Sequence, residues 1–472
     1  MASRGLTAAL IGAGARGHAA YGAYALKHSD QIRFVAVVEP NDTRRQRFAK
    51  AHAIPPERQF QTWEELMGQG KIADVAFVCT VDRMHSEPAI AALEAGYDVF
   101  LEKPMATTVS DCIRLVQTAE RTGRLLEVGH VLRHTAFFST LHEIVASGRL
   151  GDIVAVEHRE NVAYWHMAHS YVRGNWRNSE VESPIILAKC CHDLDIMYWN
   201  LGPCKQLNSS GSLIHFRPEN APKGAPERCI NGCPVASDCP WNAMHAYLDL
   251  LPLMHIARRS PSIPLRLYGT LLLDYPWIVK AACRLIPSLN RLFDYQGWPI
   301  STTFDDPSQE GRREALKTGP YGRCVYHCDN NVADYQVVNM EFEQGASGTL
   351  ILNGHSHDES RSVRYDGTRA TLTGEFASYD KRYTLEIHDH LRGRVERIHP
   401  EAGDGQHGGG DTGIMNSLFY ALQDRSNPAS VSAARESLES HLMAFAAEEA
   451  RHKGNVVCMS EFRRQTISGQ YQ

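Results

Sequence analysis

A glycine-rich motif near the N-terminus has the spacing of a loop that binds dinucleotides. Residues 12–17 read Gly-Ala-Gly-Ala-Arg-Gly, a complete G-x-G-x-x-G motif that directly follows an apolar run at 6–11. In such a loop the first glycine permits a tight turn, the second lets the backbone approach a pyrophosphate, and the third lets the next helix pack closely. A second apolar run at 34–38 ends in Glu39, whose carboxylate could bind the ribose hydroxyls of NAD and repel the 2′-phosphate of NADP, although Arg44 and Arg45 lie nearby. We therefore expect NAD as cofactor, held by Gly12, Gly14, Arg16, Gly17 and Glu39.

Other polar residues stand where further predicted strands end. Apolar runs at 73–79, 98–101 and 125–129 are separated by helical patterns at 86–95 and 109–122. In a doubly wound parallel sheet, ligands bind beyond the carboxyl ends of the strands. We therefore expect cofactor contacts from Thr80, His85, Glu102 and Lys103, and a substrate contact from His130.

The elements that must position these residues divide the chain into two parts. Alternating strand and helix patterns predict an α/β fold over residues 1–130, a Rossmann domain with a doubly wound parallel sheet. Alternating apolar residues at 335–353 and hairpin patterns at 363–373 and 383–399 predict a sheet in the remainder, 131–472. A segment at about 205–322, with Pro-rich loops and apolar stretches, is interpreted as an insertion that covers the site or forms a subunit interface.

The tripeptide Glu102-Lys103-Pro104, together with the motif at 12–17, resembles the glucose-fructose oxidoreductase/inositol dehydrogenase family (Gfo/Idh/MocA). The resemblance extends over most of the chain. It implies a Rossmann domain followed by an α+β domain with an open, mostly antiparallel sheet, NAD(P), a sugar or polyol substrate, and a homodimer or homotetramer. It also implies that Lys103 lies between the nicotinamide and the substrate, where an ammonium group could exchange a proton with a hydroxyl.

The second catalytic element implied by this resemblance is altered. Family members commonly carry Asp-x-x-x-His at the start of a helix, whereas this chain has Ala188 in the place of the aspartate and His192 in the place of the histidine. Lys189 could take over part of the missing polar role, or it could form a structural salt bridge with Asp193 or another acid. We therefore predict Lys103, His192 and Lys189 as the catalytic residues.

A run of aromatic and basic residues at 164–177 has the composition of a carbohydrate-binding loop. Aromatic rings stack on sugar rings, and arginines bind carboxylate, sulfonate or phosphate groups. A glycine-rich loop at 403–413 could also reach the substrate. We expect substrate contacts, with an anionic sugar in view, from Tyr164, His166, Arg173, Trp176, Arg177, Lys189 and His407.

The chain has 12 cysteines, several of which are clustered. Cys229, Cys233 and Cys239 follow one another closely, and Cys324 and Cys328 come much later. Four thiolates suit tetrahedral zinc, and we predict a structural zinc site at Cys229, Cys233, Cys239 and Cys328. Disulfides and unlinked thiols remain alternatives, while the spacing matches no iron–sulfur motif that we can justify.

Composition excludes several classes of protein. The net charge is −5 and 43% of residues are hydrophobic, which gives no reason to expect a nucleic-acid partner. No run of about 18 uncharged apolar residues appears, so we expect no membrane partner. The N-terminal residues lack the pattern of a signal peptide, and we expect a cytoplasmic protein.

Three functions fit these observations. The first is an NAD-dependent glycosidase that transiently oxidises its sugar at C3, eliminates the aglycone, adds water and reduces the ketone again. The second is an NAD-dependent sugar or polyol dehydrogenase, and the third is a non-catalytic NAD-binding sensor. The missing aspartate and the enlarged second part favour the first, which needs an additional base and acid.

Overall fold

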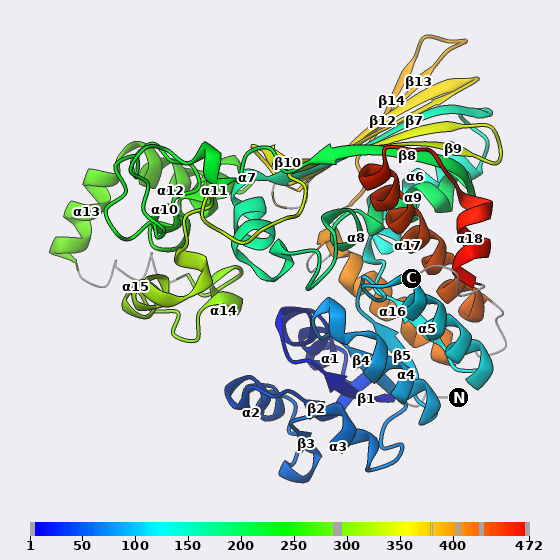
Figure 1. Cartoon of the computed structure of the whole chain (residues 1–472), viewed down its shortest axis with the longest axis horizontal. Coiled ribbons are helices and arrows are strands. Elements are labelled where there is room, and N and C mark those ends of the chain that lie inside the picture. Colours follow the sequence, from blue (N-terminus) through cyan, green and yellow to red (C-terminus); the bar gives the residue numbers. More distant parts are fainter. Residues whose placement is uncertain are drawn as a thin grey trace.

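The computed structural model describes residues 5–286, 295–377, 379, 381–401, 403, 407–423 and 429–467. Two sheets organise these residues, one in the N-terminal part and one in the C-terminal part, and a helical insertion projects to one side (Figure 1). None of the helices in the described ranges has the length and apolar character needed to span a bilayer.

The first sheet is parallel and has the strand order β3-β2-β1-β4-β5-β6. Its central strands are buried along their length because helices cover both faces. This architecture confirms the predicted Rossmann fold. The strands are β1 (Leu6–Ile11), β2 (Ile32–Val38), β3 (Gln59–Phe60), β4 (Val75–Val78), β5 (Asp98–Leu101) and β6 (Leu126–Val128). The helices are η1 (Ala15–Gly22), α1 (Ala23–Lys27), α2 (Asp42–Ala51), α3 (Trp63–Met67), α4 (Ser86–Glu94) and α5 (Val109–Thr122).

The second sheet is mixed, with the order β14-β13-β12-β11-β7-β10-β9-β8-β15. β7 and β10 run parallel and the other described pairs are antiparallel, so the expectation of a mostly antiparallel sheet is confirmed. The strands are β7 (Ile153–Ala163), β8 (Cys204–Ser212), β9 (Tyr335–Phe342), β10 (Ser347–Ser356), β11 (Ser360–Gly367), β12 (Ala370–Ala377), β13 (Arg382–Asp389), β14 (Val395–Ile398) and β15 (Val457–Cys458). The helices packed with it include α6 (Ala136–Ala146), α8 (Ile185–Ala188), α9 (Cys191–Leu201), α17 (Ala429–Lys453) and α18 (Met459–Ile467).

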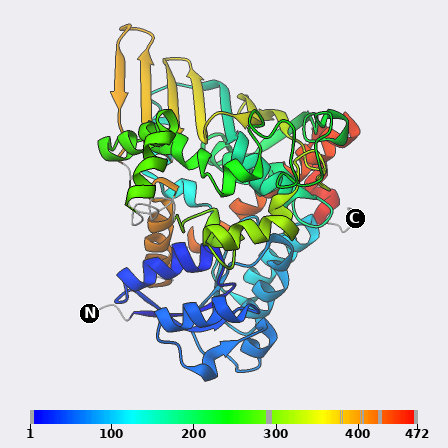
Figure 2. The ribbon, with the colours of Figure 1, turned by 90° about the vertical axis from the view of Figure 1, so that its left-hand side faces the viewer.

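The insertion starts later than the sequence predicts. Residues 205–212 belong to β8, which pairs with β9 along its length, so the chain leaves the sheet only after Ser212. It returns at Tyr335, the first residue of β9. Between these points the helices are α10 (Ala243–Tyr247), α11 (Leu251–Arg259), α12 (Ile263–Asp274), α13 (Pro276–Leu285), α14 (Ile300–Thr303) and α15 (Gln309–Thr318). They surround a small apolar core of their own that includes Tyr247, Phe304 and Leu316, and they face the viewer in Figure 2.

The predicted boundary at residue 130 is crossed by two late helices. α16 (Gly410–Gln423) packs Ile414, Met415 and Leu418 into the apolar core of the Rossmann sheet. α17 contacts α5 and β6 on one side and α9 and β8 on the other. These contacts join the two parts of the chain.

Candidate functional site

The glycine loop has open space only where a ligand would need it. Gly12 has a φ of +98°, and a Cβ there would lie 2.6 Å from the carbonyl oxygen of Cys79. A Cβ on Gly17 would collide with the carbonyl oxygen of Gly12. A Cβ on Gly14 would meet no atom within 4 Å, at the start of η1. The protein's own packing therefore requires Gly12 and Gly17, whereas the space beside Gly14 fits an external pyrophosphate.

Glu39 stands beside this loop, as expected. Its carboxylate accepts hydrogen bonds from the backbone N–H of Ala13 at 2.9 Å and of Asn41 at 3.1 Å. Arg45 donates to the carbonyl oxygen of Glu39 and pairs with Asp42, which occupies its charge. A carboxylate at this position, with its nearest arginine already paired, fits NAD better than NADP.

Arg16, Glu102 and His407 meet in one ion network over the glycine loop. Arg16 donates to Glu102 at 2.6 Å and to Asp411 at 2.7 Å, and His407 Nδ1 lies 3.2 Å from the same Asp411 oxygen. Tyr21 also donates to Glu102. Burial opposes ionisation of Glu102, but Arg16 lowers its pKa below the ordinary value. The network joins the cofactor loop to α16, and Asp411 was not among the predicted site residues.

Lys103 lies at the junction of the two parts of the chain. It follows β5, and its Nζ donates a 2.8 Å hydrogen bond to the carbonyl oxygen of Ala188 at the end of α8. The backbone of Ala188 thus provides an acceptor at the position where the family resemblance implied an aspartate. His85 holds the same loop, because its ring nitrogens contact the carbonyl oxygens of Pro104 at 2.6 Å and Thr80 at 3.2 Å.

Two buried histidines adjoin Lys103. The ring centres of His130 and His192 are 5.7 Å apart. Within the described residues, neither nitrogen of His130 nor Nδ1 of His192 has a hydrogen-bond partner. Burial, and next to it the charge of Lys103, holds the pKa of His192 well below its ordinary value; burial and Arg133 do the same for the pKa of His130. Both rings are therefore neutral at pH 7 and can accept a proton.

A second cluster of charged groups surrounds Lys189. The Nζ of Lys189 is 2.5 Å from Glu359 and 3.2 Å from Glu160, and His166 Nδ1 is 3.0 Å from the second oxygen of Glu359. Burial opposes the charge of Lys189, but Glu359 and Glu160 hold its pKa well above the ordinary value. Burial would raise the pKa of Glu359, yet His166 and Lys189 bring it well below the ordinary value. Lys189 is therefore a permanent cation rather than a base.

Glu160 and Glu359 were missed by the sequence analysis. Glu160 lies on β7 opposite Arg361 of β11, which it contacts at 2.6 Å, and Glu359 directly precedes β11. Arg361 also pairs with Asp193 at 2.9 Å. Lys189 therefore forms a salt bridge with acids other than Asp193, which is the alternative that left the partner of this lysine open. About 200 residues separate these acids in the chain, and no local pattern marks them.

The predicted substrate loop divides between the site and the scaffold. His166 belongs to the Lys189 cluster, and Tyr164 begins the same short helix, α7 (Tyr164–His166). Trp176 donates to Asp82 of the Rossmann part at 2.9 Å, and Arg177 donates to Asp329 at 2.8 Å. The roles of Trp176 and Arg177 as substrate ligands stay predictions, and these contacts do not support them.

Arg173 lies among the cysteines instead of beside Lys103. It is 2% exposed and donates to the carbonyl oxygens of Arg323 and Trp241, each at 2.7 Å. Cys229, Cys233 and Cys239 line a common apolar pocket with Cys324, whereas Cys328 donates to the carbonyl oxygen of Cys324. The pocket is thus lined by three of the four predicted ligands together with Cys324, and the role of Cys328 as a ligand stays a prediction. Among the described residues, no group of three or more His, Cys, Asp or Glu side chains is arranged to hold a metal ion.

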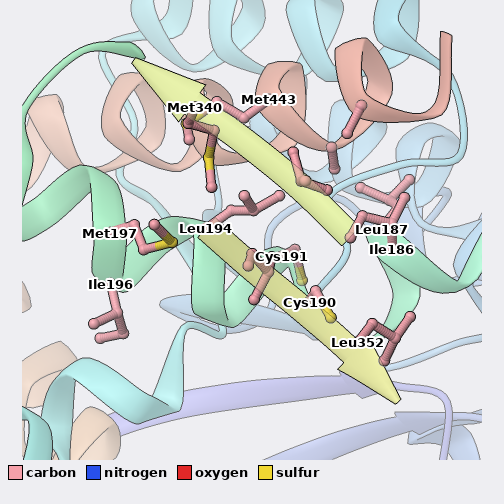
Figure 3. Close-up of a cluster of buried hydrophobic side chains, with 14 of the residues drawn as sticks. Ile186, Leu187, Cys190, Cys191, Leu194, Ile196, Met197, Met340, Leu352 and Met443 are labelled. Atoms are coloured by element: carbon pink, nitrogen blue, oxygen red, sulfur yellow. The ribbon is translucent and has the colours of Figure 1, made fainter. Parts of the chain in front are cut away.

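A hydrophobic core holds the segment that carries Lys189 and His192. Figure 3 shows side chains of α8 and α9, including Ile186, Leu187 and Leu194, in one buried cluster with Met340 of β9 and Met443 of α17. These side chains are almost completely buried. Close packing of this kind restricts movement of the attached backbone, so it fixes Lys189 and His192 relative to Lys103.

Comparisons with known proteins agree with this architecture. Residues 6–130 match the model of the Oxidoreductase family, NAD-binding Rossmann fold, and residues 142–223 match that of the Oxidoreductase family, C-terminal alpha/beta domain. The protein YteT of Bacillus subtilis is 26% identical over 385 residues, which are 77% of this chain and 76% of that protein. Inositol 2-dehydrogenase of Salmonella typhimurium is 28% identical over 172 residues, 36% of this chain and 47% of the enzyme.

A solved structure extends the likeness of fold to nearly the whole chain. Levoglucosan dehydrogenase in complex with NADH and levoglucosan superposes with a TM-score of 0.63 at 15% identity, over 96% of this chain and 99% of that one. The two family models follow each other in the order in which the two sheets occur here. The chain is therefore similar to the Gfo/Idh/MocA oxidoreductases over residues 6–130 and 142–223, and the first of these stretches is an NAD-binding Rossmann domain.

Proposed function

We propose that this protein oxidises a hydroxyl group of a sugar or polyol with NAD, at a site formed by Lys103, His192 and His130. The observation that carries the proposal is the meeting of an ammonium group with two buried, neutral imidazoles beyond the strand ends. Carbohydrate as substrate class is supported by the names of two similar proteins, which act on inositol and on levoglucosan. NAD, when bound, takes up a hydride from a carbon that bears a hydroxyl group and can return it.

The residues of the chain divide the proton transfer among them. Lys103 can pass its proton to His192 and take up the proton that the reacting hydroxyl loses on oxidation, while its Nζ also donates to the Ala188 carbonyl oxygen. His192 is neutral and has an unpartnered Nδ1 in the described part of the chain, so it can accept the proton from Lys103. His130 lies against His192 and can serve as its relay.

We further propose that oxidation is the first step of glycoside cleavage. A plain dehydrogenase needs one base, but this site has a second acid–base pair in His166 and Glu359, beside the cation of Lys189. A ketone at C3 makes the adjacent C–H acidic. His166, oriented by Glu359, would remove that proton while Lys103, which holds the reacting oxygen, stabilises the negative charge on it.

The remaining steps return every electron to the sugar. The electron pair left by the C–H proton forms a C=C bond as the glycosidic C–O bond breaks, and the leaving oxygen takes a proton. Water then adds across the C=C bond, and the returned hydride with a proton restores the hydroxyl group. The net reaction is hydrolysis, so no NADH accumulates.

The charges around the site bear on the charge of the substrate. Lys189 is already compensated by two carboxylates, and Arg173 and Arg177 are engaged elsewhere; an anionic sugar therefore finds its cation mainly in Lys103. His407 belongs to the ion network of Arg16 and Asp411, where it could contact the substrate.

We keep a homodimer or homotetramer as the expected assembly. A structural zinc ion would belong to the cysteine pocket and take no part in the reaction.

A panel of neutral and anionic p-nitrophenyl glycosides, with and without NAD, tests the proposal. We expect nitrophenol release that requires NAD and leaves no net NADH. Release should disappear in Lys103→Met but persist in Lys205→Met, a matched change at an exposed lysine that pairs with Glu341. His166→Ala should abolish release while NADH still forms from the free sugar.

Each contrary result has a defined meaning. NADH formation from free sugars without glycoside cleavage, unaffected by His166→Ala, would establish a dehydrogenase instead. NAD binding without turnover of any sugar would refute catalysis at this site and leave an NAD-binding sensor.

A further inference from the structure

Four cysteines from two distant segments line one apolar pocket in the insertion. Cys229, Cys233 and Cys239 come from the stretch after β8, and Cys324 comes from the stretch before β9. The two segments are held together as a short ribbon. Cys229 N donates to Gly322 O at 3.1 Å and Cys324 N donates to Glu227 O at 2.8 Å, and no disulfide joins any of the four thiols.

A buried guanidinium group adjoins these thiols. Arg173 donates to Cys229 Sγ at 3.7 Å in addition to its two backbone carbonyl oxygens. No carboxylate pairs with Arg173 among the residues that the structure describes. A buried charge is costly unless an opposite charge balances it. Thiolates at the pocket would supply the missing negative charge.

A free cysteine thiol, with an ordinary pKa of about 8.5, is largely uncharged at pH 7. Metal coordination deprotonates cysteine outright. An anionic centre of four thiolates and a metal would then balance Arg173.

The segment that carries Cys229, Cys233 and Cys239 also has little regular secondary structure in its described residues. Between Ser212 and Ala243 the described secondary structure consists of the three-residue 3-10 helix η7 (Pro218–Asn220) and a single β-bridge from Arg228 to Arg323. Long irregular segments inside a compact protein are uncommon, and metal ions commonly provide the stability that such segments cannot obtain from a core. Tight turns position the thiols, with Ala236 N donating to Cys233 O and Cys239 N to Val235 O.

We propose that Cys229, Cys233, Cys239 and Cys324 bind a structural metal centre through four thiolates. Thiolates select zinc or an iron–sulfur cluster among biological metals. Because the described side chains are not yet arranged around a common point, loading would draw the sulfurs together. Arg173 is the last residue of η5 (Met167–Arg173), which follows directly on α7, so the centre would also anchor the segment that carries His166.

Metal analysis of the full-length protein, prepared without chelators under both aerobic and anaerobic conditions, tests this inference. We expect either about one zinc per chain, or iron with acid-labile sulfide and visible absorption. The two results identify the occupant, and both support the site. Cys233→Ser and Cys239→Ser should each lose at least half of the metal.

Matched controls separate this site from other thiols. Cys328→Ser and Cys458→Ser should retain the wild-type metal content, since Cys328 bonds to a backbone carbonyl and Cys458 is exposed on β15. Wild-type protein without metal from every preparation, including one supplemented with zinc, would overturn the inference. So would metal that stays at wild-type content in Cys233→Ser and Cys239→Ser, or thiol titration showing that the four cysteines form disulfides.

Discussion

Replacing Gly14 with alanine should weaken NAD binding without destabilising the protein. A Cβ at this position would meet no protein atom within 4 Å, and the backbone has a φ of −74° and a ψ of −160°, an extended conformation open to alanine. Gly→Ala changes at compatible positions stabilise proteins by about 0.4–1 kcal/mol. The thermal midpoint of Gly14→Ala should therefore equal or slightly exceed that of the wild type.

The expected loss of NAD affinity follows from the proposed use of the space beside Gly14, which is to admit the pyrophosphate. If a pyrophosphate approaches the backbone at Gly14, a methyl group there separates the phosphate from the N–H groups at the start of η1. Hydrogen bonds to a charged group contribute about 1.5–3 kcal/mol, which corresponds to a rise of about ten- to a hundredfold in the Kd of NAD.

Calorimetric titration with NAD and thermal unfolding, performed on the same samples, check both halves of this prediction. Gly68→Ala is the matched control, because its Cβ would sit 3.4 Å from Glu64 at the end of α3, far from the loop; it should bind NAD normally. Gly12→Ala should instead lower the free energy of unfolding by about 1–2 kcal/mol or more. The φ of Gly12 is +98°, and a Cβ there would lie 2.6 Å from the carbonyl oxygen of Cys79. Wild-type NAD affinity in Gly14→Ala would refute the assignment of the pyrophosphate site.

Three further changes test other parts of the structure. Asp195→Ala should lower the free energy of unfolding by about 3 kcal/mol in urea titrations, because it strips Arg133 of two hydrogen bonds of 2.7 and 2.8 Å to a buried carboxylate; an unchanged midpoint would show that the pair contributes nothing. Burial raises the pKa of Glu127 to about 7, so the folded protein binds a proton that the unfolded chain has lost, and stability should fall as the pH rises from about 4 to about 7. Glu127→Gln should reduce this fall, and equal pH profiles of the two proteins would contradict the assignment. Glu39→Gln should reduce the preference for NAD over NADP by about tenfold in binding titrations, through removal of the charge that repels the 2′-phosphate, and an unchanged preference would place that discrimination elsewhere.

Features carried by contiguous residues could be predicted from the sequence. The turn at Gly12, the helix start at Gly14 and the carboxylate at the end of β2 belong to one βαβ unit, in which spacing alone dictates the geometry. Lys103 was found in the same way, because it directly follows a buried strand. The alternation of strands and helices likewise predicted the parallel sheet and its ligand-binding edge.

The insertion shows where local patterns became ambiguous. Residues 205–212 contain lysine, asparagine and serine, and they form an outer strand of the second sheet rather than the start of an insertion. A strand with one exposed face requires few apolar residues, so nothing in its composition marks it strongly. Its place in the sheet follows from its pairing with β9, more than 120 residues later.

What the sequence by itself determined is the cofactor loop, the position of Lys103 and the class of fold, since each depends on residues that are neighbours in the chain. Only the tertiary structure decided which acids surround Lys189, which four cysteines share a pocket, and that Arg173 lies with them. Glu160 and Arg361 meet through the register of β7 and β11, and Cys324 comes beside Cys229 because their two segments pair. Sheet register and the pairing of distant segments depend on the packing of the whole molecule, which no local spacing encodes.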